Sequence, residues 1–210
     1  MDKCHRTLWR NIDKKFLIIG NKNAITYKEV FPLIKDNKLW IGVTPMSTDL
    51  LFEFPSQSVE DVLQNGKRGS TYRIVDGRIL GRSPSIWFTN LDHNKRHEFM
   101  DLVCRYSPEE YPHYDNYDAI EVNKTADIPC NYPGVMGVPI TFLDKYNPEQ
   151  FEILGITDRG NEWGLKKKDY TIDDNPKFAD LNRRGAILLG GSLVSTYARI
   201  LIRNKHPQQI

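Results

Sequence analysis

The chain has 210 residues, of which 40% are hydrophobic and 27% are charged. This composition is typical of a globular protein with a real core, arranged as one large domain or two small ones. The formal net charge is only +2, which excludes a strong overall basic field, so nucleic-acid binding would need local clusters of Lys and Arg.

Targeting and metal signals are absent from the sequence. No apolar run approaches the roughly 20 residues of a membrane helix, and the polar N-terminal segment does not resemble a signal peptide. The three cysteines, Cys4, Cys104 and Cys130, form no CxxC pair, which argues against a zinc site and favours a reducing compartment. We therefore expect a cytoplasmic protein with no membrane partner and no bound metal.

The first elements follow an α/β pattern. A short apolar run at residues 16–19 ends at a glycine and predicts a buried strand of a parallel sheet. Residues 26–35 predict a helix with a capping box that begins at Thr26, although Pro32 indicates either that the first part is a separate turn or that the helix starts late. Residues 38–43 predict a second strand, which completes one strand–helix–strand unit.

The next part of the chain is expected to contain an insertion and a hairpin. Residues 44–70 mix proline, glycine and acidic side chains, which favours an irregular, exposed excursion. Residues 72–80 predict a β-hairpin, because Asp76-Gly77 is a type I′ turn signal. Residues 85–90 predict another strand, and residues 92–106 a polar helix.

From residue 107 the pattern becomes mainly β. Tyrosine and proline are dense through residue 117, which indicates an irregular but well-packed connection. Residues 157–185 predict loops with a short helix, and Gly190-Gly191 predicts a turn between the last two strands. The predicted strands span residues 118–122, 138–143, 151–156, 186–189 and 196–202.

Basic residues gather in two places and are the candidate nucleic-acid contacts. Arginines on hairpins and loops grip phosphates or enter a groove; the alternative is an ordinary solvated face. The first cluster is Lys67, Arg68, Arg73, Arg78 and Arg82, and the second is Arg159, Lys166, Lys167, Lys168, Arg183 and Arg184.

Three polar residues, Asn21, Asn23 and Tyr27, follow the first predicted strand. Ligands bind at the carboxyl ends of parallel strands, so these side chains are candidate substrate contacts, with loop capping as the alternative.

Two other patterns are weaker. His93 and His97 have metal-ligand spacing but no His-Glu-x-x-His string. Asp118, Glu121 and Lys124 loosely resemble a nuclease set, but the spacing of Glu121 and Lys124 does not place them on one face of a strand.

Five segments have distinctive sequences. Taken together and in this order, they resemble the EcoRI-type adenine-specific DNA methyltransferases. The resemblance covers most of the chain after residue 14, and it is weak between residues 44 and 70. The segments are KKFLIIGNKNAITYKEVFPLI (14–34), WFTNLDHNKRHE (87–98), YDNYDAIEVNKTADIP (114–129), GVMGVPITFLDKYNPEQFEILG (134–155) and STYARILIR (195–203).

The resemblance implies a fold and a site. It implies an α/β chain with a partial Rossmann-like methyltransferase sheet in residues 1–106 and a β-rich target-recognition region in residues 107–210. Methyltransferases of this kind bind S-adenosylmethionine and extrude the target adenine from the duplex. By resemblance Trp87, Phe88 and Asn90 lie on the strand that reaches the target-base pocket, where aromatic rings stack on a base.

The catalytic motif of such enzymes, (Asp/Asn)-Pro-Pro-(Tyr/Phe), is missing, because the sequence contains no Pro-Pro dipeptide. No Gly-x-Gly turn follows an N-terminal strand. We therefore expect the chain to begin just after the catalytic loop, with no catalytic residue and no cofactor of its own. S-adenosylmethionine would bind only if a partner chain completed the site, and a partner chain or self-association would cover the open sheet edge.

These observations leave three hypotheses open. The first is a truncated, catalytically inactive relative that binds DNA or a DNA-acting protein complex, for example as an antagonist of a DNA-targeting defence system. The second is one subunit of a split, S-adenosylmethionine-dependent adenine-specific DNA methyltransferase. The third is a remnant with no function beyond folding.

Overall fold

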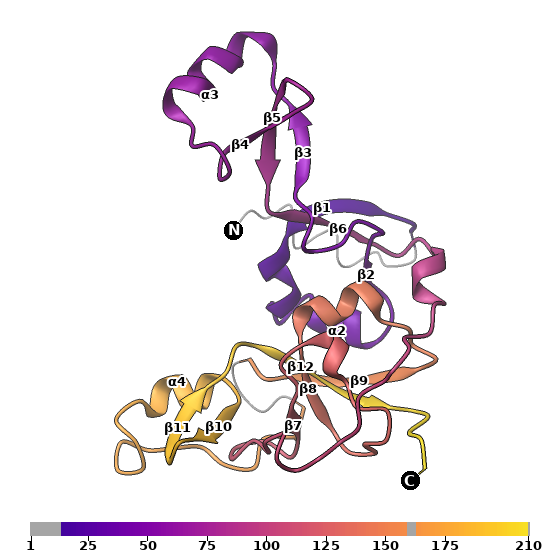
Figure 1. Cartoon of the computed structure of the whole chain (residues 1–210), viewed down its shortest axis with the longest axis vertical. Helices are drawn as coiled ribbons and strands as arrows, with labels where there is room; N and C mark the ends of the chain where they lie inside the picture. The colour runs from indigo at the N-terminus through magenta and orange to yellow at the C-terminus, as the bar shows by residue number, and fades with distance from the viewer. Residues whose placement is uncertain (1–13, 159–162, 210) are drawn as a thin grey trace.

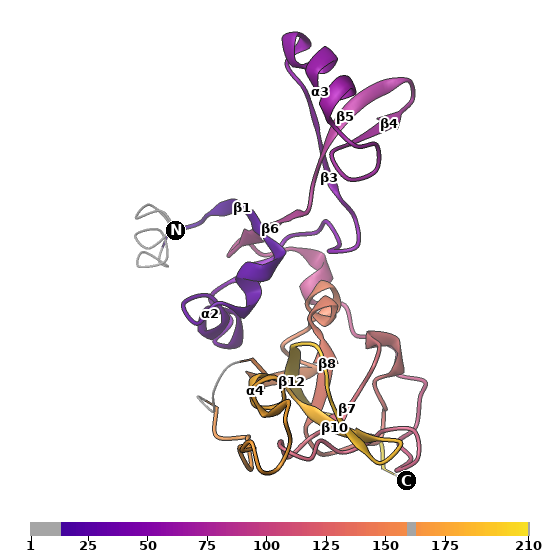
Figure 2. The same cartoon turned by 90° about the vertical axis from the view of Figure 1, so that its left-hand side faces the viewer.

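The computed structural model describes residues 14–158 and 163–209. The chain forms a body built from three small sheets and their connections, and a narrow arm that projects away from it (Figures 1 and 2). Cys4 and Arg159 lie outside the described residues. In the described part of the chain no helix is long and apolar enough to cross a membrane.

The N-terminal sheet has three strands in the order β1-β6-β2, namely β1 (Leu17–Asn21), β2 (Trp40–Ile41) and β6 (Ser85–Thr89). Strand β6 is antiparallel to both neighbours. The prediction of a strand at residues 16–19 is confirmed, but its predicted buried place in a parallel sheet is wrong. Leu17 and Ile19 are 54% and 41% exposed, because β1 is an edge strand of this sheet and packs only one face on the core.

The helix predicted at residues 26–35 is shorter than expected. A 3-10 turn η1 (Lys22–Thr26) precedes the helix α2 (Phe31–Lys35). Pro32 lies in the first turn of α2, where its missing N–H would have no partner inside the helix in any case. The late start is confirmed. The capping box at Thr26 is wrong, since the residue that caps α2 is Val30, which offers no side-chain hydrogen bond.

The arm contains β3 (Leu50–Glu53), η2 (Ser56–Ser58), α3 (Val59–Asn65), β4 (Tyr72–Val75) and β5 (Arg78–Ser83). Its three strands form an antiparallel sheet in the order β3-β5-β4. The predicted hairpin is confirmed: Asp76 and Gly77 have φ angles of 49° and 75°, as a type I′ turn requires. The predicted excursion at residues 44–70 is exposed but not wholly irregular, because it supplies β3 and α3.

The turn of the arm gives a first prediction. Replacing Gly77 with Ala is expected to destabilise the β4–β5 hairpin by about 1 kcal/mol, because a side chain with Cβ is strained at this positive φ. Asp76→Asn is the control and is expected to change little, since Asn tolerates the left-handed region. Hydrogen exchange of the β4 and β5 amides measures both; equal protection in the two variants would contradict the assignment of the turn.

The second half of the chain forms a four-stranded sheet in the order β7-β8-β12-β9. The strands are β7 (Ile120–Glu121), β8 (Met136–Pro139), β9 (Phe151–Ile156) and β12 (Arg199–Asn204). Beside it lie α4 (Phe178–Arg183) and the hairpin of β10 (Ala186–Leu189) and β11 (Ser192–Ser195). The short turns η3, η4 and η5 span Asn94–Arg96, Thr125–Asp127 and Ile140–Lys145.

Three expectations for this half need correction. The polar helix predicted at residues 92–106 does not form; only η3 is helical there. The reason is a distant partner: Gln150 accepts a hydrogen bond from the amide of Met100 and donates one to its carbonyl, which holds the segment extended. The strand predicted at residues 138–143 ends at Pro139 and continues as η5. The Gly190-Gly191 turn joins β10 to β11, and the last strand, β12, begins only at Arg199.

The largest of three hydrophobic clusters spans both halves of the chain. It joins Ile25, Phe31 and Phe88 from the first half to Phe142 and Phe151 from the second. The predicted boundary at residue 106 therefore does not separate two cores, and the division into two domains stays a prediction. The fold is mixed α/β with several small sheets. A Rossmann-like sheet is not confirmed, because β7 with β8 is the one parallel strand pair in the described residues.

Candidate functional site

The arginines of the first predicted cluster share one face of the arm. Residues directly opposite each other in antiparallel strands point to the same side. Leu80 lies opposite Arg73, Val75 lies opposite Arg78, and Leu51 lies opposite Arg82. Since Arg78, Leu80 and Arg82 alternate along β5, all three arginines project from the same face. We call Arg73, Arg78 and Arg82 the arginine face.

Two carboxylates organise this face. Asp49 accepts hydrogen bonds from Arg73 at 2.7 Å and Arg82 at 2.6 Å, and Glu53 accepts one from Arg78 at 2.9 Å. The hydrogen bond from Arg82 is the main cause that lowers the pKa of Asp49 below its ordinary value. The side chains of Arg73 and Arg78 are nevertheless at least half exposed. The pairs hold the guanidinium groups in place while leaving them open to solvent.

The remaining members of the first cluster lie at one end of the arm. Lys67 and Arg68 follow α3 and are exposed, and among the described residues neither forms an ion pair. The first turn of α3 carries the carboxylates Glu60 and Asp61 instead. Positive groups thus belong to the strands and the α3–β4 connection of the arm, whereas the start of its helix is acidic.

The second predicted cluster is mostly engaged within the body. Lys167 pairs with Asp118 at 3.2 Å, and Lys168 pairs with Asp115 at 2.6 Å. The others make short contacts, Lys166 with Asp169 and Arg184 with Asp158. The pairs of Lys167 and Lys168 attach the loop after residue 163 to residues 115–118, and the pair of Arg184 attaches the end of α4 to Asp158. Arg183 is exposed and forms no ion pair in the described part of the chain.

The predicted base contacts on β6 occupy different environments. Phe88 is 1% exposed and fills the core, so its ring has no face free for a base. Trp87 lies on the opposite side of the sheet, opposite Ile19 of β1, and is partly exposed. Asn90 accepts a hydrogen bond from the amide of Phe16 and donates to the carbonyl of Lys14, which fastens the start of β1 to the end of β6.

The polar residues at the end of β1 and just after it mainly hydrogen-bond to the local backbone. The side chain of Asn21 accepts a hydrogen bond from the amide of Asn23 and so caps η1. The carbonyl of Asn23 accepts one from the Thr26 hydroxyl. Tyr27 is 38% exposed. Asn21 thus has the capping role that was the alternative to ligand binding, while the exposed ring of Tyr27 remains available.

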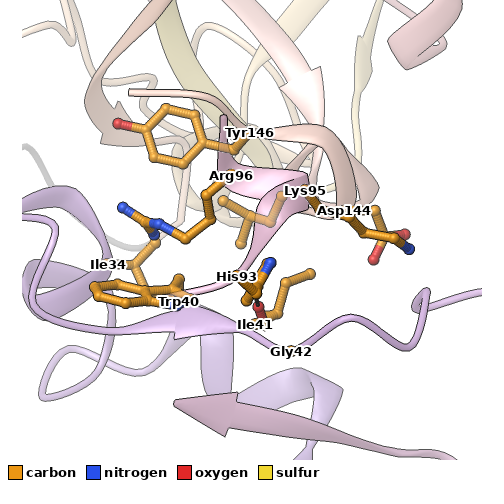
Figure 3. A pocket seen from close by; sticks show the side chains of 10 residues that line it. Ile34, Trp40, Ile41, Gly42, His93, Lys95, Arg96, Asp144 and Tyr146 are labelled. Atoms are coloured by element: carbon orange, nitrogen blue, oxygen red, sulfur yellow. Dashed lines mark hydrogen bonds between the residues drawn. The ribbon is translucent and has the colours of Figure 1, made fainter. Parts of the chain in front are cut away.

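A small pocket that the sequence did not reveal lies between the N-terminal sheet, η3 and η5 (Figure 3). The guanidinium of Arg96 stacks on the ring of Trp40, 3.6 Å from its centroid. His93 hydrogen-bonds through Nε2 to the carbonyl of Ile41, and its other ring nitrogen is buried without a partner. Trp40 and Arg96 come from separate segments, and no spacing in the sequence signals their contact.

Charged side chains beside this pocket hold the root of the arm. Lys95 donates to the carbonyl of Val43 at 2.7 Å, and Asp144 accepts from the amide of Met46 at 2.9 Å. Lys22 donates to the carbonyl of Met46 as well. Burial raises the pKa of Asp144. Residues 43–46, which lead from β2 into the arm, are therefore attached to the body through their backbone.

The patterns weighed against metal and nuclease chemistry have other roles. His97 pairs with Asp92, and within residues 14–158 and 163–209 there is no group of three or more potential metal ligands. Glu121 is buried, where it pairs with Arg199 and accepts a hydrogen bond from Tyr114. Lys124 is exposed, so the loose acid–acid–lysine set does not assemble.

Comparisons with known proteins identify the class. A family model described as the adenine-specific methyltransferase EcoRI matches residues 7–205. The chain belongs to this family of DNA methyltransferase-related proteins. It is 43% identical over 201 residues to the Type II methyltransferase M.EcoRI of Escherichia coli. It is also 37% identical over 144 residues to M.MpnI of Mycoplasma pneumoniae, and 39% identical over 145 residues to M.MgeORF184P of Mycoplasma genitalium.

The matched relatives are longer proteins. The match to M.EcoRI covers 94% of this chain and 52% of that protein, and the two mycoplasma matches cover 67% and 68% of this chain and 44% of each relative. The chain therefore spans about half the length of the curated relatives it matches. No solved structure matches it.

Proposed function

We propose that this chain is a DNA-binding module of the adenine-specific methyltransferase family and that the arm makes its principal contact with the duplex. The observation that carries the proposal is the arginine face: three guanidinium groups on one side of a β-sheet that projects from the body. A two-stranded β-ribbon fits the major groove, and the three arginines belong to the β4–β5 hairpin of the arm. Arginines bind phosphates and guanine edges through two hydrogen bonds at once.

The ion pairs of the arm are compatible with this role. Exposed pairs contribute only about 0–1 kcal/mol, so a phosphate can replace Glu53 at Arg78 with little loss of stability. Asp49 is more enclosed and holds two arginines at once. It keeps the guanidinium groups ordered before DNA arrives, which lowers the entropy lost on binding.

Under this proposal, the chain alone does not transfer a methyl group to DNA. The sequence has no Pro-Pro dipeptide, and Phe88 is enclosed in the core rather than open to an extruded base. Binding to DNA is therefore expected without S-adenosylmethionine. The hypothesis that such a module antagonises a DNA-targeting defence system stays a prediction, since no contact in the described residues bears on it.

A second candidate function rests on the edge of the N-terminal sheet. Strand β1 has a neighbour only on one side in the described residues, and its outer face exposes Leu17 and Ile19. An apolar strand edge of this kind accepts a further strand. The chain would then be one part of a methyltransferase, completed by a polypeptide that carries the donor-binding and catalytic motifs. Methyl transfer on mixing with such a polypeptide, and not with either part alone, supports this alternative.

The test of the main proposal is the salt dependence of DNA binding. In Arg73→Gln/Arg78→Gln, Arg82 still pairs with Asp49, so the arm keeps its organisation. Loss of two phosphate contacts is expected to flatten the slope of log K against log salt by about two. Fluorescence anisotropy with a labelled duplex between about 50 and 200 mM salt measures this slope.

The matched control is Lys28→Gln/Lys124→Gln, which removes the same charge from exposed positions outside the arm. Its slope is expected to equal that of the unmodified chain. If both double variants show the same slope, the arm is not the DNA-binding element and the proposal is wrong.

A further inference from the structure

The arm shares neither a sheet nor a hydrophobic cluster with the body in the part of the chain that the structure describes. Its three strands pair with one another and with no strand of the body. No residue between 50 and 83 belongs to any of the three hydrophobic clusters. The direction in which the arm projects (Figures 1 and 2) therefore depends on the two connections at its root.

The connection that leads into the arm is fastened to the body along its backbone. The amide of Gly42 still donates to the carbonyl of Trp87 in the N-terminal sheet, at 2.8 Å. Four residues further on, Met46 is 3% exposed and packs in the largest cluster. Only residues 47–49 then separate the body from β3, so the anchoring of residues 43–46 sets the point from which the arm departs.

Three charged side chains from separate turns of the body converge on this connection. Lys95 of η3 donates to the carbonyl of Val43 at 2.7 Å, and Lys22 of η1 donates to that of Met46. Asp144 of η5 accepts from the amide of Met46 with both carboxylate oxygens, at 2.9 and 3.1 Å. We call Lys22, Lys95 and Asp144 the root clamp.

Asp144 holds this connection and makes no other hydrogen bond within the described residues. Burial raises the pKa of its carboxyl, while the hydrogen bond from Met46 and the charges of Lys95 and Lys22 favour the ionised form. A buried carboxylate is costly unless it is hydrogen-bonded or paired. The compensation for Asp144 thus comes from the connection itself and from the other two members of the root clamp.

The connection that leads back from the arm is shorter. Strand β5 ends at Ser83 and β6 begins at Ser85, with Pro84 alone between them. The hydroxyls of the two serines hydrogen-bond to each other at 2.9 Å, and no charged side chain of the described residues bonds to this backbone. A single attachment acts as a pivot. The root clamp supplies the second attachment, which fixes the direction of the arm.

We propose that Asp144 is a positioning residue for DNA binding, which fixes the direction of the arm so that arm and body contact one duplex together. The inference rests on the proposed function, because it needs the arginine face to grip DNA. Immobilising the backbone of one residue on binding lowers affinity roughly tenfold. The root clamp orders the connection before DNA arrives, so binding does not incur this loss.

The first experiment measures the motion of the arm without DNA. Nitrogen-15 relaxation gives the rotational correlation times of the amides of residues 50–83 and of the body separately. The two are expected to be equal in the unmodified chain, and the arm is expected to have the shorter one in Asp144→Ala. The matched control is Asp144→Asn, which keeps the shape of the side chain and an oxygen for the amide of Met46. It is expected to retain a single correlation time.

The second experiment measures the affinity of the same variants for a labelled duplex. Asp144→Ala is expected to bind roughly tenfold more weakly at about 50 mM salt with an unchanged salt slope, because the phosphate contacts are the same and only their ordering has changed. Asp144→Asn is expected to bind like the unmodified chain. Both variants remove one negative charge, which by itself favours DNA, so a weaker affinity of Asp144→Ala alone is not an effect of charge.

The outcomes separate this inference from the proposed function. Equal correlation times of arm and body in Asp144→Ala, or the same behaviour of the Ala and Asn variants, would overturn the role of Asp144. A mobile arm with unchanged affinity would overturn its link to DNA binding. If the unmodified chain binds no DNA, the proposed function fails, whereas the relaxation data still test the root clamp. Should Asp144→Ala fail to fold, Lys22→Met replaces it, and the same shorter correlation time of the arm is expected.

Discussion

Glu121→Gln is expected to lower the free energy of unfolding by about 3 kcal/mol or more, because it leaves Arg199 buried without a countercharge. Glu121 is 1% exposed and accepts hydrogen bonds from Nε of Arg199 and from the hydroxyl of Tyr114. Burial raises the pKa of Tyr114 well above its ordinary value, so the hydroxyl keeps its proton and remains a donor. Chemical denaturation measures the loss.

The matched control is an ion pair further along β12, the strand that carries Arg199. Glu152 pairs with Arg203 of β12 at 3.6 Å, and both side chains are about half exposed. Glu152→Gln is therefore expected to cost less than about 1 kcal/mol. If the two variants lose the same stability, the buried cluster of Glu121, Tyr114 and Arg199 does not have the role that its burial implies.

Phe88→Ala and Trp87→Ala are expected to differ sharply although the residues are neighbours. Phe88 packs in the core, and its loss is expected to cost about 3–5 kcal/mol through lost burial and the cavity left behind. Trp87 lies on the partly exposed face of β6, so its loss is expected to cost about half as much. The denaturant midpoints of the two variants measure these losses of stability. A larger loss of stability for Trp87→Ala than for Phe88→Ala would contradict the orientation of β6.

Local signals in the sequence predicted the strands and turns best. The hairpin at residues 72–80 follows from Asp76-Gly77, and β9 follows from a short apolar run, because both depend on neighbouring residues. The strand at residues 85–90 was also predicted from its own composition. In each case the information lies within a few residues, which is the range over which turn geometry and alternation act.

The errors arose where a distant residue decides the structure. Residues 92–106 resemble a polar helix, but only η3 is helical there, and Gln150 holds the backbone of Met100 in an extended segment. Strand β1 resembles a buried strand of a parallel sheet, yet its neighbour β6 is antiparallel and leaves Leu17 exposed. A sequence pattern carries no information about which strand will lie alongside.

The sequence likewise predicted some parts of the candidate site and missed others. The arginines of the arm were found because basic residues around a hairpin suggest phosphate contacts, and the register of β4 and β5 then places them on one face. The pocket at Arg96 was missed, since its partner Trp40 comes from a different strand. The second basic cluster was visible in the sequence, but its ion pairs with Asp115 and Asp118 depend on the tertiary fold.

Excision of the arm tests the central claim most directly. Leu50 and Ser83 are cross-strand partners at the root of the arm, so residues 51–82 can be replaced by two glycines without separating the ends. The shortened chain is expected to keep the Tm of the body and to lose at least about tenfold in affinity for duplex DNA at about 50 mM salt. An unchanged affinity in a folded, arm-free chain would show that the DNA-binding surface lies elsewhere and would contradict the account.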